Sequence, residues 1–284
     1  MPLVTANDVL IPARANGYAV GAFNCINLEF VQACIQAAEA ENSPVMIATT
    51  TGALKYASWV GFPAAIRAMA EASAVPVVLH LDHGQTLEEI ERALKAGFSS
   101  IMIDASHLPY GENVALTKKA AELTHAYGMS LEAEIGQIGG KEDDIVADEA
   151  LTDPSVVEDF VRSTGLDILA PAFGSAHQKT RGDVSLDLPR LEKIAAATPL
   201  PLVLHGGSGV PFEAMQNVIA RGVGKVNLGT ELQKTFSAKL RETFLANPSE
   251  WDGRKLFKPS IETLTNVVRD RMKTIGSSGK GGVV

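Results

Sequence analysis

Short apolar segments rich in branched residues alternate along the chain with alanine-rich segments whose apolar residues recur at helical spacing. Eight of the apolar segments have the length of buried strands, and they cover residues 19–23, 45–49, 75–81, 100–103, 130–134, 168–172, 202–205 and 225–228. The segments between them predict helices at residues 28–41, 63–72, 87–95, 112–127, 154–163, 188–197 and 211–221. Strands that alternate with helices run parallel, because each helix returns the chain to the same edge of the sheet. Eight such units in 284 residues predict an α/β fold, a single (β/α)8 TIM barrel.

The same pattern divides the chain into one domain and a short tail. No linker-like segment interrupts residues 1–275, so we expect a single barrel domain that ends in a C-terminal helical extension at residues 259–275. The glycine- and serine-containing residues 276–284 are expected to form a flexible tail. Two loops after predicted strands, residues 136–152 and 178–187, are long and contain glycine, which is typical of lids or of disordered inserts.

Composition places the chain among globular proteins. It is 46% apolar and 20% charged, which excludes disordered and fibrous classes. No apolar run approaches the roughly 20 residues of a membrane span, and the N-terminus lacks the features of a secretory signal, so we expect a cytoplasmic protein. The net charge of −8, without a basic stripe, argues against nucleic acid and membranes as partners and favours a small molecule.

Polar residues gather where the predicted strands end. They are Asn24, Thr50, Asp82, His83, Asp104, Glu134, His177, His205 and Asn227. The carboxyl ends of the strands form the catalytic face of a TIM barrel, whereas apolar side chains normally fill its interior. These polar residues therefore predict an active site.

Three of the six histidines, His83, His177 and His205, fall at these strand ends. One such histidine alone would more often be a hydrogen-bonded core residue. Three that converge on one face leave an open coordination position, which is how proteins hold a catalytic zinc ion. His80 points to the same face of its strand as Asp82, and we interpret it as a packing residue or a support for the ligands.

A glycine-rich turn at residues 205–211 leads from the seventh strand into a helix. Its glycines allow backbone N–H groups to approach an anion at the N-terminus of that helix. Residues 227–230 end the eighth strand, and the loops after strands seven and eight are where TIM barrels most often bind phosphate. The turn therefore predicts a phosphorylated substrate.

Carboxylates supply acid and base groups for the predicted site. Asp82 adjoins the first candidate metal ligand, and Glu142 lies on the glycine-rich lid, from which closure would deliver it to the substrate. Asp104 and Glu134 would either hold a second cation or orient the histidines, and the sequence leaves both roles open. Lys225 is the only lysine in a predicted barrel strand and thus the candidate for a Schiff base, but we favour a metal as the electron sink.

Five segments in register carry a family resemblance: residues 80–84 (HLDHG), 102–107 (MIDASH), 132–136 (EAEIG), 139–144 (GGKEDD) and 205–209 (HGGSG). Through them the chain resembles the class II, zinc-dependent ketose-bisphosphate aldolases over most of its length. It is most similar to the shorter bacterial branch, which contains fructose-1,6-bisphosphate and tagatose-1,6-bisphosphate aldolases.

The resemblance implies a catalytic zinc ion (Zn2+) held by three imidazoles, those of His83, His177 and His205. It implies that Asp82 acts as the acid and base at the C4 oxygen of a ketose bisphosphate. Glu142 on the mobile loop would handle the proton at C3.

Further cations and the substrate residues follow from the same resemblance. A second divalent cation is implied at Asp104 and Glu134, and a monovalent cation, Na+ or K+, near a substrate phosphate. The residues expected to bind the substrate, including its dihydroxyacetone phosphate half, are Asn24, Thr50, Gln178, Gly206, Gly207, Ser208, Asn227, Leu228, Gly229 and Thr230.

Three positions depart from the family pattern. Gln178 stands where the family usually has a glycine near the phosphate, and Gly229 where it commonly has Ala, Asp or Asn. Ile261 stands where relatives often carry an arginine that reaches the distal phosphate of a neighbouring subunit; Lys258 and Arg254 are the candidate substitutes. The sequence leaves the ligand of this second phosphate open.

We therefore predict a class II fructose-1,6-bisphosphate aldolase, which reversibly forms dihydroxyacetone phosphate and glyceraldehyde 3-phosphate in glycolysis and gluconeogenesis. Tagatose-1,6-bisphosphate aldolase is the alternative, because the two substrates differ only in stereochemistry at C4. A metal-dependent hydrolase would leave the phosphate turn unexplained, and a non-catalytic phosphosugar-binding protein would need neither Asp82 nor Glu142. By analogy with the family, we expect a homodimer or homotetramer.

Overall fold

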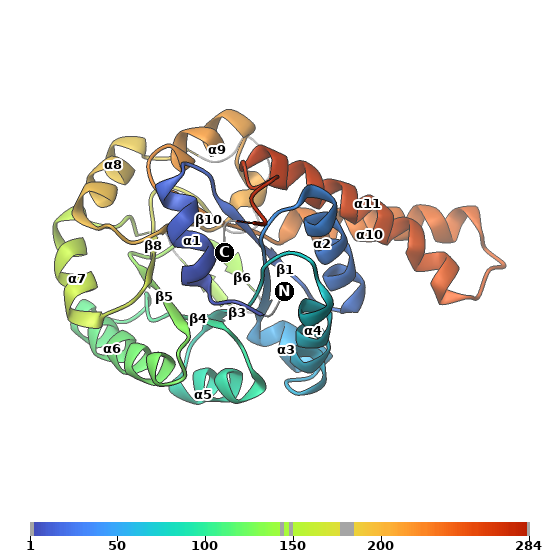
Figure 1. Cartoon of the computed structure of the whole chain (residues 1–284). Helices are drawn as coiled ribbons and strands as arrows, with labels where there is room; N and C mark the ends of the chain where they lie inside the picture. The colour runs from blue at the N-terminus through green and yellow to red at the C-terminus, as the bar shows by residue number, and fades with distance from the viewer. Residues whose placement is uncertain (1–2, 143–144, 148–149, 177–184, 283–284) are drawn as a thin grey trace.

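The central sheet of the protein closes into a barrel. The computed structural model describes residues 3–142, 145–147, 150–176 and 185–282, and within these residues eight parallel strands form a closed barrel (Figure 1). The barrel strands are β1 (Val20–Asn24), β2 (Val45–Thr50), β3 (Val77–Gly84), β4 (Ser100–Ile103), β5 (Ser130–Ile135), β8 (Ile168–Pro171), β9 (Leu202–Leu204) and β10 (Val223–Leu228). Their order is β1-β10-β9-β8-β5-β4-β3-β2, so strands that follow one another in the chain are neighbours. The predicted (β/α)8 TIM barrel is confirmed.

Helices cover the outside of the barrel. The helices that the sequence predicted are α2 (Leu28–Glu41), α4 (Gly61–Ala72), α5 (Leu87–Ala96), α6 (Tyr110–Ala126), α7 (Val157–Thr164) after the 3-10 turn η1 (Pro154–Val156), α8 (Leu188–Ala197), α9 (Phe212–Ile219) and α11 (Gly253–Thr274). Helix α11 begins six residues before the predicted start at residue 259. Asp252 caps it by accepting a hydrogen bond from the Arg254 N–H, and the helix continues through Pro259.

Helix α1 (Ala6–Ala15) was not predicted, because Pro12 interrupts its short apolar pattern. A capping box between Thr5 and Asp8 begins the helix. Its inner face consists of four buried residues, Ala6, Val9, Leu10 and Ala13, which pack on apolar residues of the barrel interior. Helix α1 therefore closes the end of the barrel at which the strands begin.

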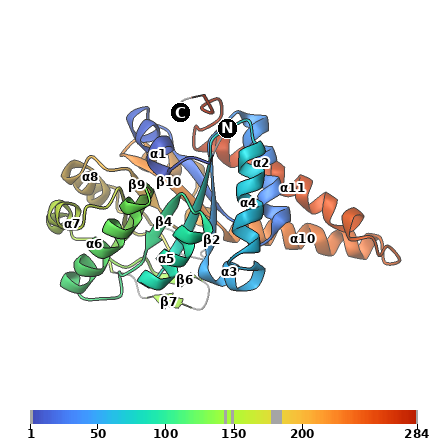
Figure 2. The ribbon, with the colours of Figure 1, turned by 60° about the horizontal axis from the view of Figure 1, so that its bottom comes forward.

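Three further elements lie after strands. Helix α3 (Thr51–Ala57) follows β2, and a hairpin of β6 (Gly140–Glu142) and β7 (Ile145–Ala147) follows β5. Figure 2 shows α1 and this hairpin at opposite ends of the barrel. Helix α10 (Thr230–Ala246) follows β10 and packs along α11, and the pair forms an arm that projects from the barrel (Figure 1).

The inward-facing positions change character along the strands. Near their N-terminal ends they are apolar and pack with α1, for example at Val20, Val78 and Val203. Near their C-terminal ends they carry buried polar groups, which begin with His80 on β3 and Lys225 on β10. The barrel therefore has an apolar half and a polar half, and the polar half contains the predicted site.

The described part of the C-terminal tail lies against the barrel. Ser277 is fully buried and its hydroxyl lies 2.8 Å from that of Ser43. The backbone N–H groups of Gly279 and Gly281 donate to the carbonyl oxygens that end α2. The division into a barrel domain, residues 1–275, and a flexible tail stays a prediction. None of the helices in the described residues is both long and apolar enough to cross a membrane.

Candidate active site

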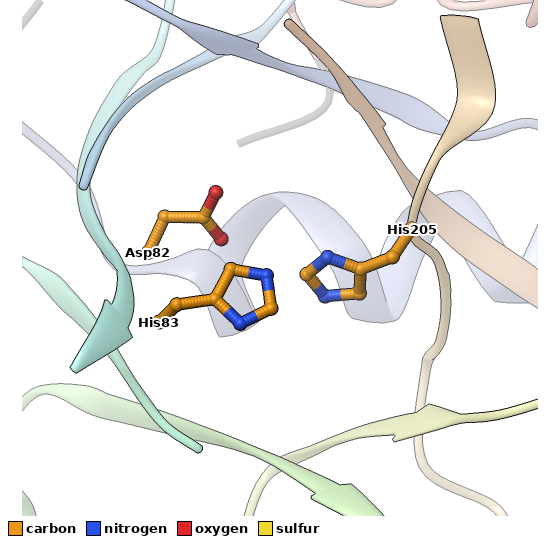
Figure 3. Close-up of side chains that lie close together, drawn as sticks. All are labelled: Asp82, His83 and His205. Atoms are coloured by element: carbon orange, nitrogen blue, oxygen red, sulfur yellow. The ribbon is translucent and has the colours of Figure 1, made fainter. Parts of the chain in front are cut away.

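The centre of the candidate site consists of Asp82, His83 and His205. One ligand atom from each lies within 4.8 Å of the others, and all three residues are buried (Figure 3). His205 follows β9, while Asp82 and His83 are consecutive residues of β3. Strands β3 and β9 are separated in the barrel order, so the site joins opposite sides of the barrel.

An irregularity in β3 lets two consecutive residues reach the same site. Side chains normally alternate between the two faces of a strand. The register of β3 with β4 shifts between Leu81 and Gly84, and His83 has a positive φ of 50°. Such a backbone is costly for a residue with a side chain, and bulges of this kind re-aim side chains at functional sites. Here it brings His83 beside Asp82.

Each imidazole is oriented by a carboxylate. Nδ1 of His83 lies 2.8 Å from Asp104, and Nε2 of His205 lies 3.1 Å from Glu132. A carboxylate accepts hydrogen bonds, so these ring nitrogens donate, and the lone pairs are on Nε2 of His83 and Nδ1 of His205. The rings meet edge to face with their centroids 4.8 Å apart. Burial lowers the pKa of His205 to about 4, which keeps its imidazole neutral, the form that binds metals.

Asp82 is held by two amides. The side-chain amide of Asn24 donates to one of its oxygens (2.7 Å) and that of Asn227 to the other (3.0 Å). Burial opposes ionisation of Asp82, but its interactions with the neighbouring side chains of His83, His80 and Lys225 outweigh it and hold the pKa of the carboxyl well below its usual range. The group therefore stands ionised, as a base requires.

A second group of ligand atoms lies beside the first and consists of His83, Asp104 and Glu134. Burial and the charge of Asp104 raise the pKa of Glu134 to about 8, while one of its oxygens accepts a hydrogen bond from the Ile138 N–H (2.9 Å). Asp104 also accepts two hydrogen bonds from Ser106. The sequence left open whether Asp104 and Glu134 hold a second cation or orient the histidines. The structure shows one orienting contact, between Asp104 and His83.

The donor sets fit divalent metals. Two imidazoles oriented by carboxylates, with a third carboxylate beside them, are ligands that zinc takes in proteins. His177, the third predicted zinc ligand, and Gln178 lie outside the described residues. Glu142 is the last residue of β6 and pairs in register with Ile145 of β7. Its predicted role stays a prediction.

The glycine-rich turn packs against the end of β10. Gly206 has a φ of 66°, and a Cβ there would lie 2.5 Å from the Ala176 carbonyl oxygen. A Cβ on Gly207 would lie 2.6 Å from Val226, so only glycine permits this close approach. The Ser208 hydroxyl accepts a hydrogen bond from the Glu231 N–H in the first turn of α10 (3.3 Å). The turn thus lies beside the N-terminus of the 17-residue helix α10, where backbone N–H groups can bind an anion.

Other predicted substrate residues have structural contacts of their own. The Thr50 hydroxyl caps α3 by accepting a hydrogen bond from the Ala53 N–H (3.2 Å). The side chain of Leu228 is buried in the apolar core between the barrel and the helices, so Leu228 can contact a ligand only through its backbone. Gly229 lies against Asn24 and directly precedes Thr230, the first residue of α10. Their substrate contacts stay predictions.

Two charged residues of the site were not recognised from the sequence. Glu132, which contacts His205, lies in a quoted motif but received no role, and Lys225 was considered only as a Schiff-base lysine. Both are fully buried, and Lys225 forms an ion pair with Glu132 (2.7 Å). The available signal was a charged residue at an inward position within a buried strand, two residues before a strand-end residue.

A TIM barrel with imidazoles and carboxylates clustered at its catalytic end belongs to the metal-dependent barrel enzymes. The comparison with protein families narrows this class. Residues 4–280 match the family described as "Fructose-bisphosphate aldolase class-II". The chain belongs to the class II fructose-bisphosphate aldolase family, whose members are lyases that use a divalent metal, and the resemblance seen in the sequence is confirmed.

Individual relatives agree with this family over their full lengths. A Bacillus subtilis protein named "Probable fructose-bisphosphate aldolase" is 45% identical, with 99% of this chain and 100% of the relative covered. A Staphylococcus aureus fructose-bisphosphate aldolase is 42% identical, with 99% of each chain covered. The crystal structure of the YdjI aldolase from Escherichia coli K12 superposes with a TM-score of 0.87 at 32% identity and covers 98% of this chain and 99% of its own.

Proposed function

We propose that this protein is a zinc-dependent fructose-1,6-bisphosphate aldolase, which reversibly cleaves its substrate to dihydroxyacetone phosphate and glyceraldehyde 3-phosphate. The observation that carries the proposal is the buried group of Asp82, His83 and His205 at the catalytic end of the barrel. Relatives with full-length matches carry the name fructose-bisphosphate aldolase, which favours this substrate over tagatose 1,6-bisphosphate.

His83, His177 and His205 would hold the zinc ion. When bound, zinc supplies a Lewis acid for the negative charge that develops as the C3–C4 bond breaks. Asp104 and Glu134 offer the ligands for a second divalent cation, and the corner between the glycine-rich turn and α10 is where a monovalent cation would accompany the phosphate.

The protein side chains move the protons. Asp82, ionised and held by two amides, accepts the proton of the C4 hydroxyl as the C4 oxygen becomes an aldehyde. The electron pair of the C3–C4 bond passes to the dihydroxyacetone phosphate half, and Glu142 delivers a proton to C3. Replacement Glu142→Gln should therefore slow deuterium exchange at the hydroxymethyl carbon of dihydroxyacetone phosphate, which corresponds to C3 of the ketose, by about 100-fold. NMR of the product measures this exchange, and an unchanged rate would identify another residue as the proton donor.

The ligand of the distal phosphate would come from a neighbouring subunit. Arg254 and Lys258, the candidate substitutes for the family arginine, lie in the first turns of α11, on the projecting arm (Figure 1). The arm also exposes Phe244, Leu245 and Trp251 to solvent. A homodimer or homotetramer would cover these apolar residues. Sedimentation should show such an oligomer, and a monomer at micromolar concentration would contradict it.

A coupled assay with both ketose bisphosphates tests the proposal. Fructose 1,6-bisphosphate should be cleaved, chelation of the metal should reduce turnover about a thousandfold or more, and added zinc should restore it. Full activity in metal-free protein would refute the metal role. Preference for tagatose 1,6-bisphosphate would correct the substrate, and release of inorganic phosphate without dihydroxyacetone phosphate would indicate a hydrolase.

A further inference from the structure

Three titratable side chains lie inside the barrel, beneath the cluster of ligand atoms. They are His80 on β3, Glu132 on β5 and Lys225 on β10, all fully buried. Each stands two residues before a residue of the site: His80 before Asp82, Glu132 before Glu134, and Lys225 before Asn227. Apolar side chains normally occupy these interior positions of a TIM barrel. The proposed mechanism gives none of the three a proton transfer or a contact with the substrate.

Lys225 has an acceptor for each of its three ammonium protons. Its Nζ lies 2.9 Å and 2.7 Å from the two carboxylate oxygens of Glu132 and 3.3 Å from Nε2 of His80. The other ring nitrogen of His80 lies 2.9 Å from the Ser100 hydroxyl, which fixes the orientation of the ring. Lys225 is therefore engaged as a cation, and both oxygens of Glu132 are held in place.

Glu132 in turn fixes the orientation of the His205 imidazole. The oxygen of Glu132 that lies 2.9 Å from Lys225 also lies 3.1 Å from Nε2 of His205. Since a carboxylate accepts hydrogen bonds, His205 carries its proton on Nε2 and its lone pair on Nδ1. Carboxylates that bind the second nitrogen of a metal-binding histidine set its tautomer, its orientation and its basicity.

Stability does not account for this buried ion pair. Burying two charges is costly, and an apolar pair of similar volume is often equally stable or more stable. An apolar pair would fill the same space in the barrel but would leave the ring of His205 free to rotate or to change tautomer.

We propose that Glu132 and Lys225 act together as a positioning pair, which holds His205 with its Nδ1 lone pair directed at the metal site. The inference rests on the proposed function, in which His205 is a zinc ligand. Lys225 fixes Glu132, and Glu132 fixes the imidazole. Neither residue contacts the substrate.

The double replacement E132L/K225M removes the pair without leaving a buried charge. We expect the affinity of the protein for zinc, measured by competition with a chromogenic chelator, to fall about 10- to 100-fold. The melting temperature of the metal-free variant should stay within about 4 °C of that of the unmodified protein. In cobalt-substituted protein, the visible absorption bands should shift, because they report the geometry of the ligands.

Asp167 provides a matched control at the opposite end of the barrel. This carboxylate also accepts a hydrogen bond from Nε2 of a histidine, His125 (2.8 Å), and it directly precedes β8. Replacement Asp167→Asn should lower the melting temperature and leave zinc affinity unchanged. Equal zinc affinity in E132L/K225M and the unmodified protein would overturn the positioning role, as would an equal loss in Asp167→Asn.

NMR of the unmodified, metal-free protein tests the same inference without a variant. Long-range 15N–1H correlations report the tautomer of each histidine, and His205 should carry its proton on Nε2. A proton on Nδ1 overturns the inference, whether or not the double variant folds. Failure of the unmodified protein to bind zinc would instead overturn the proposed function, so the two results are distinguishable.

Discussion

The two halves of the barrel interior are formed by the same eight strands but have opposite chemistry. In the half where the strands begin, Val20, Val78 and Val203 pack with the apolar face of α1. In the half where they end, inward positions carry buried amides, carboxylates, imidazoles and an ammonium group. The same eight strands run through both halves, so the residue types, together with the irregularity of β3 at His83, decide which half stabilises the fold and which half forms the site.

This difference follows from the cost of burying polar groups. Each buried valine or leucine side chain stabilises the fold by about 1.5–3 kcal/mol. A buried polar group costs free energy unless it is hydrogen bonded. Buried polar groups of the site are hydrogen bonded to one another, as Asp82 is to Asn24 and Asn227. Replacements in the polar half should therefore change activity most, and replacements in the apolar half should change stability most.

Asp82→Ala should give the largest effect. It removes the proposed base at C4, so we expect kcat to fall about 100- to 10,000-fold with little change in KM. The steady-state rate of the zinc-loaded protein measures this effect. A loss of less than tenfold would remove Asp82 from its role and break the comparison, because the polar half would then not be the catalytic half.

Leu10→Ala tests the apolar half. Leu10 is fully buried on the inner face of α1, and its truncation leaves a cavity. The free energy of unfolding should fall by about 2–5 kcal/mol, while kcat per folded molecule should stay unchanged. Urea unfolding and an active-site titration separate the two quantities. A parallel loss of kcat would show that α1 also positions the site.

The barrel and the convergence of several strand-end residues were predictable from the sequence, because they depend on local patterns. The eight strands were recognisable from apolar runs, and helical spacing of apolar residues predicted helix α2 with its observed bounds. In the structure Asn27 caps its first turn and Asn42, in the left-handed conformation, ends it. The strand-end residues His83 and His205 were predicted to converge because parallel strands end at one face.

The missed features depend on contacts between distant residues. The shift in β3 that turns His83 toward Asp82 has no local signature, since it arises from pairing with β4. The ion pair between Glu132 and Lys225 joins residues 93 apart in the sequence. Helix α1 was missed because it is short and contains Pro12, and its stability comes from docking of its apolar face against the barrel.

The smallest effect is expected from deletion of residues 276–284, of which the described residues 276–282 lie at the apolar end. In the structure Ser277 is fully buried against Ser43, and the N–H groups of Gly279 and Gly281 donate to the last carbonyl groups around the end of α2. Each such hydrogen bond contributes about 0.5–1.5 kcal/mol, so deletion should lower the free energy of unfolding by about 2 kcal/mol and leave kcat unchanged. Urea unfolding of the truncated protein measures the change. An unaltered free energy of unfolding would mean that the tail is flexible, as its composition predicts, and that the residues after α11 do not stabilise the fold.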